Sequence, residues 1–514
     1  MKPLSRNLSA HGPCLLALLA FAALLFLNTP TDGDFWWFDA SRHAMNSVFI
    51  RDLLLEGGLL HPIDFARNYY QQYPGLTIGF YPPLFYLSAA PWLALFGVHH
   101  AVNQAVVVLY ALLGGSLVYL LCVRHMGRLA ATATALCVLA MPDTALWSRQ
   151  VQLDVPAIAL MLASAYGLIR YLETDGSPRW LLFTTLGLGL AILTRVQAIF
   201  AIPVLLFFLF ADPRRPRIAM KPRLKALALM LLVALPSLLI AAYFSRVNQT
   251  LAGEMPGMPK LLSLENWIWY ARALPRQMGL PALGLLVAGL VAGALTWRRP
   301  GWPPAVKVLA ALALCAWGFF TLVSNKDPRF NLPGVVLLFV ASALLLYLAL
   351  PRLARLALPA LACWLVVQAL ALSEVPVVGG FKEAALLAQE ITPHGGNVLV
   401  SARRDGSFIF NMRTLGERRD MGVRRADKMF VDMKIAAELG VKDRALDVSA
   451  IERLLKDENI QTVVAQPGYL ASQPSFRSFG QVLEAGVLYE PVRRIRITGA
   501  TPANEQELVV YRRK

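Results

Sequence analysis

Asp32-Gly-Asp34-Phe-Trp-Trp-Phe-Asp39-Ala-Ser-Arg42-His43 opens a stretch, residues 32–83, between the first hydrophobic run of the chain and the next one. Three carboxylates fall within eight positions, beside four consecutive aromatic residues. Because a carboxylate near a membrane is costly to desolvate, acids placed there need a reason. Aromatic residues favour the lipid–water interface and need none. The acids therefore pose the functional question.

Composition defines the class of protein. Of 514 residues, 57% are hydrophobic and 16% charged, and the mean hydropathy is +0.52. A soluble chain could not bury this much apolar surface, so a polytopic α-helical membrane protein is predicted. The net charge of +17 falls largely in short loops, which indicates membrane orientation and anionic lipid contact, not nucleic acid. The five cysteines lie in apolar runs without a CxxC pair, so neither a disulfide framework nor a metal cluster is expected.

Apolar runs predict about 11 transmembrane helices. The first run is not followed by a small-residue cleavage site, so it is interpreted as a retained span. Residues 84–96 are too few to cross the membrane and are predicted to form a juxtamembrane or re-entrant helix. The predicted spans cover residues 13–27, 101–122, 129–146, 155–171, 180–193, 198–210, 226–243, 281–297, 305–323, 332–350 and 356–372.

Basic residues predict the orientation. Two of them precede the first span, which places the N-terminus in the cytoplasm and an outer loop, residues 28–83, outside. Alternating crossings then place Arg124, Arg128, Arg352 and Arg355 inside, as the positive-inside rule requires. The charges left at the outer side are candidates for function, because cations there oppose the rule; the set is Asp34, Asp39, Arg149, Asp154, Arg195, Lys326, Asp327 and Arg329.

The character of the chain changes near residue 379. Short β-type runs at 398–400, 462–465 and 508–511 alternate with helical patterns at 382–391 and at 449–457, the latter with a serine cap. We therefore predict a transmembrane domain, residues 1–375, and a soluble α/β domain, residues 376–514. By the same count of crossings, the second domain lies outside.

The outer loop offers two candidate features. Asp39, with Asp34 nearby, is placed to act as a general base beside the membrane. Asp39 also precedes a helix start and is a plausible N-cap, and both roles can hold at once. Tyr81-Pro82-Pro83 enforces an extended entry into the following helix, so either a helix start or a ligand contact fits.

Three outer turns carry the other candidates. Asp154 follows Arg149 in a turn before a proline-led helix, where it caps the helix, holds Arg149 or faces a substrate. Arg195 stands between two apolar blocks; a phosphate is a natural partner, and snorkelling is the alternative. Lys326 and Arg329 flank Asp327. They predict a cluster of cations with Arg195 for a diphosphate or lipid phosphate, or a local salt bridge of either residue to Asp327.

Five motifs in order resemble those of the GT-C glycosyltransferases, in the polyprenyl-phosphate-sugar branch that includes protein O-mannosyltransferases and the lipid A aminoarabinose transferase. The resemblance covers roughly residues 15–350, and the outer domain is similar less specifically. The motifs are Asp39-Ala-Ser-Arg42-His43, Tyr81-Pro-Pro-Leu-Phe-Tyr86, Leu153-Asp154-Val-Pro156, Gly189-Leu-Ala-Ile-Leu-Thr194-Arg195 and Lys326-Asp-Pro-Arg329-Phe-Asn-Leu-Pro333.

The chain departs from the family pattern at four positions. Ala40 stands where the family has Glu, so a metal or second-carboxylate role there is in doubt, although Asp34 could substitute. Tyr81 replaces a Lys that would contact phosphate. Arg195 replaces another Lys, and Phe330 replaces a Tyr.

The resemblance implies an inverting transferase that moves a sugar from a polyprenyl-phosphate carrier to a hydroxyl of a glycan, lipid or protein, outside the cytoplasmic (inner) membrane. Asp39 is expected as catalytic base. No cofactor is certain, and a divalent cation is possible. Alternatives are a transporter or flippase of lipid-linked saccharides and a polysaccharide polymerase or ligase. The residues expected to bind substrate are Asp34, Arg42, His43, Tyr81, Arg149, Asp154, Arg195, Lys326 and Arg329.

Overall fold

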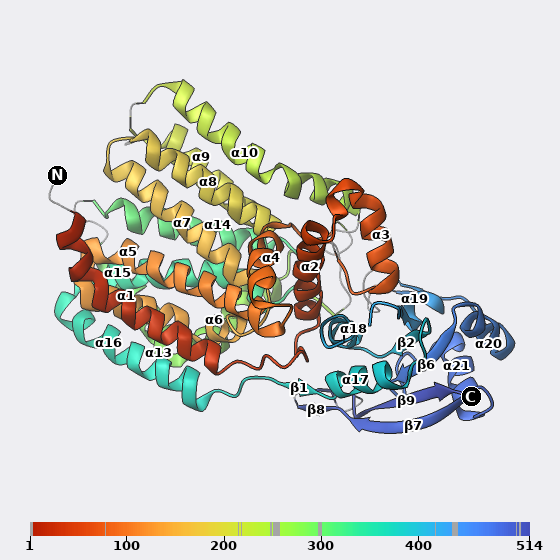
Figure 1. Ribbon diagram of the computed structural model, residues 1–514. Helices are drawn as coiled ribbons and strands as arrows, with labels where there is room; N and C mark the ends of the chain where they lie inside the picture. Colours follow the sequence, from red (N-terminus) through yellow and green to blue (C-terminus); the bar gives the residue numbers. More distant parts are fainter. Residues whose placement is uncertain are drawn as a thin grey trace. The chain divides into compact units, whose positions relative to one another are not determined.

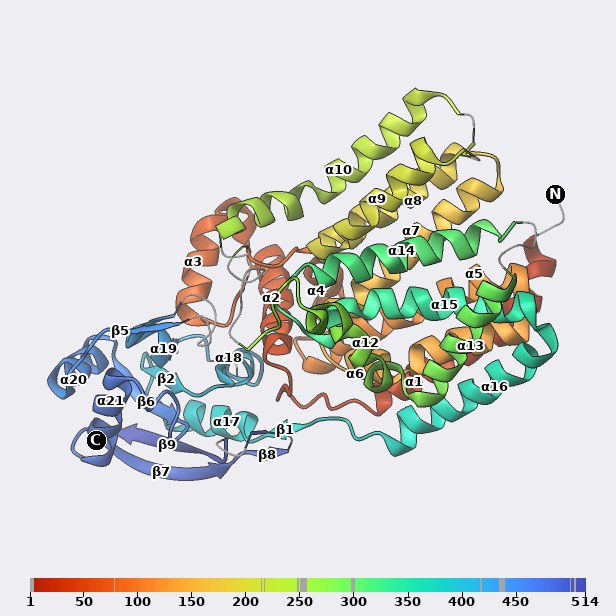
Figure 2. The same ribbon diagram turned by 180° about the vertical axis from the view of Figure 1, so that it is seen from behind.

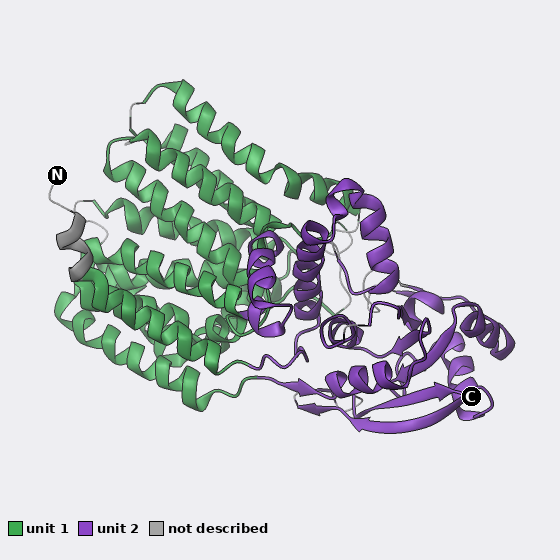
Figure 3. Ribbon diagram, in the orientation of Figure 1, with its two compact units in different colours: residues 1–29, 78–85, 105–375 green, residues 30–77, 86–104, 376–514 purple. Residues whose placement is uncertain are grey.

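The computed structural model describes residues 4–514 except 78, 214, 217, 247–248, 250–256, 297–300, 417, 434–439, 500 and 503–504. The chain forms two compact units (Figure 3). Unit 1 comprises residues 1–29, 78–85 and 105–375, and unit 2 comprises residues 30–77, 86–104 and 376–514. The predicted division at residue 376 stays a prediction; the contacts group most of the outer loop with the C-terminal part of the chain.

Unit 1 is helical. Figures 1 and 2 show its long helices running side by side. Its elements are α1 (Leu4–Leu27), α5 (His100–Ala140, whose first turn belongs to unit 2), α6 (Pro142–Trp147), α7 (Asp154–Glu173), α8 (Pro178–Thr194), η2 (Val196–Ala201), α9 (Ile202–Leu206), η3 (Phe207–Ala211), α10 (Met220–Tyr243), α12 (Leu264–Met278), α13 (Leu280–Thr296), α14 (Pro304–Thr321), η4 (Pro328–Asn331), α15 (Leu332–Ala349), α16 (Pro351–Val367) and η5 (Gln368–Leu372).

Six helices in the described part of the chain are long and apolar enough to cross a membrane, and five more apolar helices are shorter. The chain is thus a helical membrane protein, and the count of eleven spans stays a prediction. The predicted span 129–146 is wrong at its end. The helix α5 stops at Ala140, because Pro142 opens the separate helix α6, as proline favours the first turn of a helix.

Small residues bring the helices of unit 1 close together. A Cβ atom on Gly187 of α8 would lie 2.9 Å from the backbone N of Ser164 on α7. A Cβ on Gly289 of α13 would lie 2.2 Å from the carbonyl O of Ser342 on α15. Such close approaches are how helices pack when lipid removes the hydrophobic drive between them.

In unit 2, the N-terminal part contributes α2 (Phe38–Leu55), η1 (Gly58–Leu60), α3 (Pro62–Gln72) and most of α4 (Leu84–Phe96). The prediction of a short helix over residues 84–96 is confirmed. The C-terminal part contributes β1 (Val378–Gly379), α17 (Phe381–Ile391), β2 (Asn397–Ser401), α18 (Asp405–Thr414), β3 (Val423–Arg425), α19 (Ala426–Met429), β4 (Val431–Met433), β5 (Val441–Asp443), α20 (Val448–Asp457), β6 (Ile460–Ala465), α21 (Pro474–Glu484), β7 (Tyr489–Arg496), β8 (Thr498–Gly499) and β9 (Glu507–Arg513).

The C-terminal part is built on a five-stranded sheet of order β3-β2-β6-β9-β7. The strands β3, β2 and β6 run parallel, β9 pairs antiparallel to β6, and β7 pairs antiparallel to β9. Leu399 and Val463 face a core formed with α20 and α21, and α17 contacts β6 and β9. The predicted strands and helices are confirmed, but the predicted serine cap is wrong. Asp447 caps α20 by accepting the N–H of Ala450 at 2.7 Å.

The outer loop covers the end of this sheet. Arg425, at the carboxyl end of β3, donates to the carbonyl of Pro74 (3.4 Å), and Arg424 donates to that of Gln71 (2.7 Å). In open α/β sheets, ligands bind outside the carboxyl ends of parallel strands. In unit 2, the chain's own outer loop contacts the carboxyl end of β3.

Candidate active site

Asp39 lies in the first turn of α2, and its side chain is half-buried. The helix begins at Phe38, and the capping position is Trp37, whose side chain makes no capping hydrogen bond. The interpretation of Asp39 as the N-cap is therefore wrong. A carboxylate in the first turn is still favoured, because it faces the positive end of the helix dipole.

Asp34 is buried at the border between the outer loop and the C-terminal part. Its Oδ1 accepts from the Asn411 side chain (2.8 Å), and its Oδ2 accepts the N–H of Phe381 (3.1 Å). Burial raises the pKa of Asp34 to about 6, against the effect of these hydrogen bonds. Both carboxyl oxygens of Asp34 already accept hydrogen bonds from the protein. The substrate contact of Asp34 stays a prediction.

Arg42 and His43 follow Asp39 on α2 and both have protein partners. The Arg42 guanidinium lies 2.6 Å from Asp405, which also pairs with Arg425. Burial opposes ionisation of Asp405, but the two guanidinium groups hold its pKa below the usual value. The His43 Nδ1 lies 2.8 Å from the Tyr86 hydroxyl. Their predicted roles in substrate binding stay predictions.

In unit 1, Asp154 and Arg195 form an ion pair. Asp154 is the first residue of α7 and is buried. Arg195 stands in the break between α8 and η2, where the backbone is extended (φ −150°, ψ 115°). Of the interpretations offered for Asp154, pairing with Arg149 is not observed: Arg149 donates instead to the Ala369 carbonyl (2.5 Å).

Arg329 and Arg195 both contact the ring of Phe330. The guanidinium carbons of Arg195 and Arg329 lie 5.3 and 5.4 Å from the centre of the Phe330 ring. Arg329 also pairs with Asp327 (3.3 Å) and donates to Gln152 (3.3 Å). The sequence placed Arg195 and Arg329 in one cluster, and the fold does bring them to one aromatic ring.

Lys326 is directed elsewhere. Its Nζ donates to the carbonyls of Phe320 (3.0 Å) and Thr321 (2.8 Å) at the end of α14 and lies 5.4 Å from the Tyr270 ring centre. Burial lowers the pKa of Lys326 to about 8. Its geometry is that of a helix C-terminal cap. Tyr81 is half-buried, with its ring 5.0 Å from that of Phe80. Phosphate and substrate contacts of both residues stay predictions.

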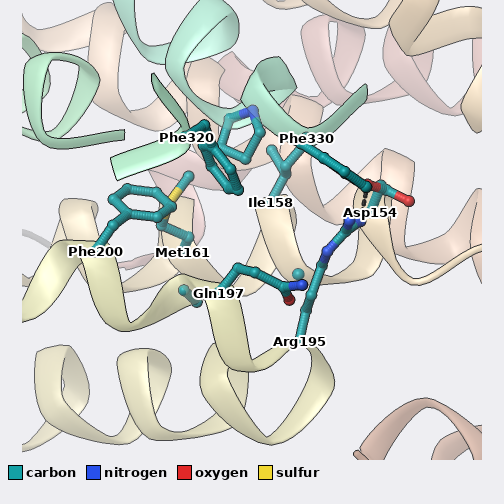
Figure 4. A pocket seen from close by; sticks show the side chains of 11 residues that line it. Asp154, Ile158, Met161, Arg195, Gln197, Phe200, Phe320 and Phe330 are labelled. Carbon is teal, nitrogen blue, oxygen red and sulfur yellow. Dashed lines mark ion pairs between the residues drawn. The ribbon is translucent and has the colours of Figure 1, made fainter. Parts of the chain in front are cut away.

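A pocket of about 310 Å³, counting its open side, lies beside the Asp154–Arg195 pair. Figure 4 shows this ion pair at one end and Phe200 at the other. Apart from Asp154, Arg195 and Gln197, the lining is apolar. It consists of Ala157, Ile158, Met161, Ala198, Phe200, Phe320, Phe330 and Pro333.

The sequence analysis did not identify the apolar residues of this pocket. Ala157, Ile158 and Met161 recur on α7 at helical spacing from Asp154, and this periodicity could have revealed them. Met161 also lines a second pocket, of about 250 Å³, along the same helix. Met161 thus separates two pockets that lie beside α7.

A divalent cation would need several convergent ligands. In the described residues, no three of His, Cys, Asp and Glu gather closely enough to hold a metal ion. Ala40 follows Asp39, and the oxygens of Asp34 accept from Asn411 and Phe381. These residues do not fit a metal beside Asp39, so no reaction step is assigned to one.

The fold is that of the GT-C glycosyltransferases. The sequence model described as "Dolichyl-phosphate-mannose-protein mannosyltransferase" matches residues 81–240. No curated protein sequence matches the chain. The resemblance to GT-C proteins expected from the motifs is thus confirmed at the level of the fold.

Two solved structures illustrate the similarity. ArnT from Cupriavidus metallidurans, bound to undecaprenyl phosphate, aligns over 98% of both chains with 17% identity and a TM-score of 0.64. The oligosaccharyltransferase AglB from Archaeoglobus fulgidus, in complex with an inhibitory peptide and a dolichol-phosphate, aligns over 97% of this chain and 75% of its own, with 11% identity and a TM-score of 0.54.

Proposed function

We propose that this chain is an inverting glycosyltransferase that moves a sugar from a polyprenyl-phosphate carrier to an acceptor hydroxyl outside the cytoplasmic membrane. The observation that carries the proposal is the pocket of unit 1, which is apolar except for Gln197 and the Arg195–Asp154 pair at one end. A guanidinium suits a phosphate, and an apolar wall suits an isoprenoid chain. ArnT, which shares the fold, was solved with undecaprenyl phosphate bound.

In this proposal, the acceptor oxygen attacks the anomeric carbon while the bond from that carbon to the phosphate oxygen breaks. Asp39 takes the proton of the attacking hydroxyl. The polyprenyl phosphate leaves with additional negative charge, which Arg195 and Arg329 stabilise. One displacement inverts the configuration at the anomeric carbon. The acceptor is a glycan, lipid or protein.

Asp154 has a defined place in this proposal. Without donor, it neutralises Arg195, because a buried unpaired guanidinium would be costly. The donor phosphate competes with Asp154 for the same guanidinium. The ion pair therefore keeps the site stable when empty and makes it selective for a strong anion.

The test is turnover by the purified protein in lipid vesicles, with a panel of polyprenyl-phosphate sugars and hydroxyl acceptors. Wild type should release free polyprenyl phosphate, and Asp39→Asn should lower the rate about 100-fold or more, the usual contribution of a general base. Asp64→Asn is the matched control, since the Asp64 side chain is 70% exposed on α3 of the same unit. It should keep the wild-type rate.

Other results would overturn the proposal. Equal release by wild type and Asp39→Asn would remove Asp39 as the base. Movement of intact donor across the bilayer by both proteins, without release of polyprenyl phosphate, would make the chain a transporter of lipid-linked saccharides.

A further inference from the structure

The segment just before Asp39 forms hydrogen bonds with the C-terminal part of unit 2. Asn411 donates its side-chain N–H to the carbonyl of Gly33 (3.2 Å), and the Phe35 N–H donates to the Ser407 hydroxyl (3.1 Å). Both partners belong to α18, more than 370 positions later in the chain. The C-terminal part thus binds the backbone just before the proposed base.

Arg404 contacts two residues shortly before Asp39 in the chain. Its guanidinium donates to the carbonyl of Trp36 and lies 4.4 Å from the centre of the Phe38 ring. Its Nε donates to Glu505 at 2.8 Å. Both Arg404 and Glu505 are buried, at 4% and 2% exposure. A buried guanidinium with two hydrogen-bond partners has little freedom, so it holds Trp36 and Phe38, three positions and one position before Asp39, in place.

Arg403, which is partly exposed to solvent, contacts the same two residues, Glu505 and Phe38. Its side chain is 40% exposed, and its Nη1 lies 3.4 Å from Glu505. Its guanidinium carbon lies 5.1 Å from the Phe38 ring centre. One carboxylate therefore holds two guanidinium groups against the aromatic ring beside Asp39, at a distance where cation–π attraction operates.

Asp405, the residue after Arg404, holds the part of α2 that follows Asp39. Asp405 binds Arg42 at 2.6 Å, three positions after Asp39 on α2. Consecutive residues, Arg404 and Asp405, therefore hold the helix start before and after Asp39. These residues all belong to unit 2.

We propose that Arg404, supported by Glu505, is a positioning residue for Asp39, so that the C-terminal part sets the position of the base. The inference rests on the proposed function, in which Asp39 takes the acceptor proton. A general base must lie within hydrogen-bond reach of that proton, and a displacement of about 1 Å costs on the order of 100-fold in rate.

The experiment compares Glu505→Gln with Asp52→Asn in the full-length protein. Asp52 is a matched control: its buried carboxylate accepts from Arg413 of α18 at 2.5 Å. It lies thirteen positions after Asp39 on the same helix, or roughly 20 Å along the axis. Each change removes one buried negative charge from an arginine of the C-terminal part.

Glu505→Gln should lower kcat by roughly 10-fold to 100-fold, with KM for the donor within about threefold of wild type. Asp52→Asn should lower thermal stability but keep kcat close to the wild-type value, because Asp52 lies far from Asp39 along the helix. Arg404→Lys is a second variant, which keeps the charge and loses the planar fork; it should lower kcat similarly.

Asp39→Asn in the same assay separates the two claims. If Asp39→Asn turns over like wild type, the proposed base is wrong and the inference falls with it. If Asp39→Asn is inactive but Glu505→Gln and Arg404→Lys keep the wild-type kcat, the inference alone is overturned. Equal losses of kcat in Glu505→Gln and Asp52→Asn would assign Glu505 a merely structural role.

Discussion

Asp34 shows how one buried residue joins distant parts of the chain at a cost. Its carboxyl group is almost inaccessible and accepts from Asn411 and Phe381. Burial outweighs those hydrogen bonds and raises the pKa to about 6. The charged form is therefore disfavoured in the folded protein relative to the unfolded chain.

Asp34 should make stability depend on pH. Its contribution is fully present below about pH 4, where the group is protonated in both states, and is lost as the pH rises through about 6. Relative to Asp34→Asn, the free energy of unfolding of wild type should fall by roughly 3 kcal/mol from pH 4 to pH 7. Thermal unfolding followed by tryptophan fluorescence measures this difference. Asp64→Asn, at an exposed site, should show no such change, and a constant difference for Asp34→Asn would contradict the prediction.

Arg195 tests the phosphate assignment at a single position. Arg195→Lys should weaken binding of polyprenyl phosphate to the purified protein about tenfold, because lysine keeps the charge but cannot bind two oxygens with a planar fork. Arg128→Lys is the control, since Arg128 is exposed and lies away from the pocket lining. Titration with the lipid by native mass spectrometry gives both affinities. Equal binding by the two variants would exclude Arg195 as the phosphate ligand.

At the scale of elements, contacts between membrane helices depend on glycine. The helices α13 and α15 pack closely where Gly289 faces the Ser342 backbone. Gly284 stands on the same helix α13, but a Cβ built there would meet nothing within 4 Å. Substitution of each glycine by alanine therefore distinguishes the effect of close helix packing, at Gly289, from the effect of helix propensity alone, at Gly284.

Gly289→Ala should destabilise the protein by about 1 to 3 kcal/mol, because the added methyl group meets backbone atoms that cannot move aside cheaply. Gly284→Ala should be neutral, or stabilising by about 0.5 to 1 kcal/mol through better helix propensity. Thermal unfolding in detergent micelles compares the two. Equal Tm values for both variants would show that α13 and α15 are less tightly packed than the structure indicates.

At the scale of the whole molecule, orientation in the membrane follows from the basic loops. The proposal places the outer loop outside, and it places Arg128, which follows the break of the α5 backbone at Gly127, inside. Leu60, at 81% exposure, and Arg128 are both accessible in their own units.

Cysteine labelling tests this orientation in a background where the five cysteines are replaced by alanine. A membrane-impermeant maleimide should label Leu60→Cys in intact cells, and Arg128→Cys only after the membrane is permeabilised. Labelling in the opposite order would invert the topology and move the proposed chemistry to the cytoplasmic side.

The sequence by itself determined that this is a helical membrane protein, because a long apolar segment in lipid must pair its own backbone N–H and C=O groups, as an α-helix does. It also determined the C-terminal strands and helices, whose periodicities differ. Ordered motifs singled out Asp39, Arg195 and Arg329 as candidates. The end of α5 was missed by six residues, because the apolar run continues beyond Pro142.

Only the tertiary structure decided which partners these residues have. Asp39 is flanked by contacts to Arg404 and Asp405, which are more than 360 positions away in the chain. Asp154 pairs with Arg195 across the α7–α8 hairpin, and not with Arg149 nearby in the sequence. A motif specifies a residue type at one position. Which charges meet depends on how helices and strands pack. Burial of a charge costs desolvation free energy, and this cost is offset only where the fold supplies a partner.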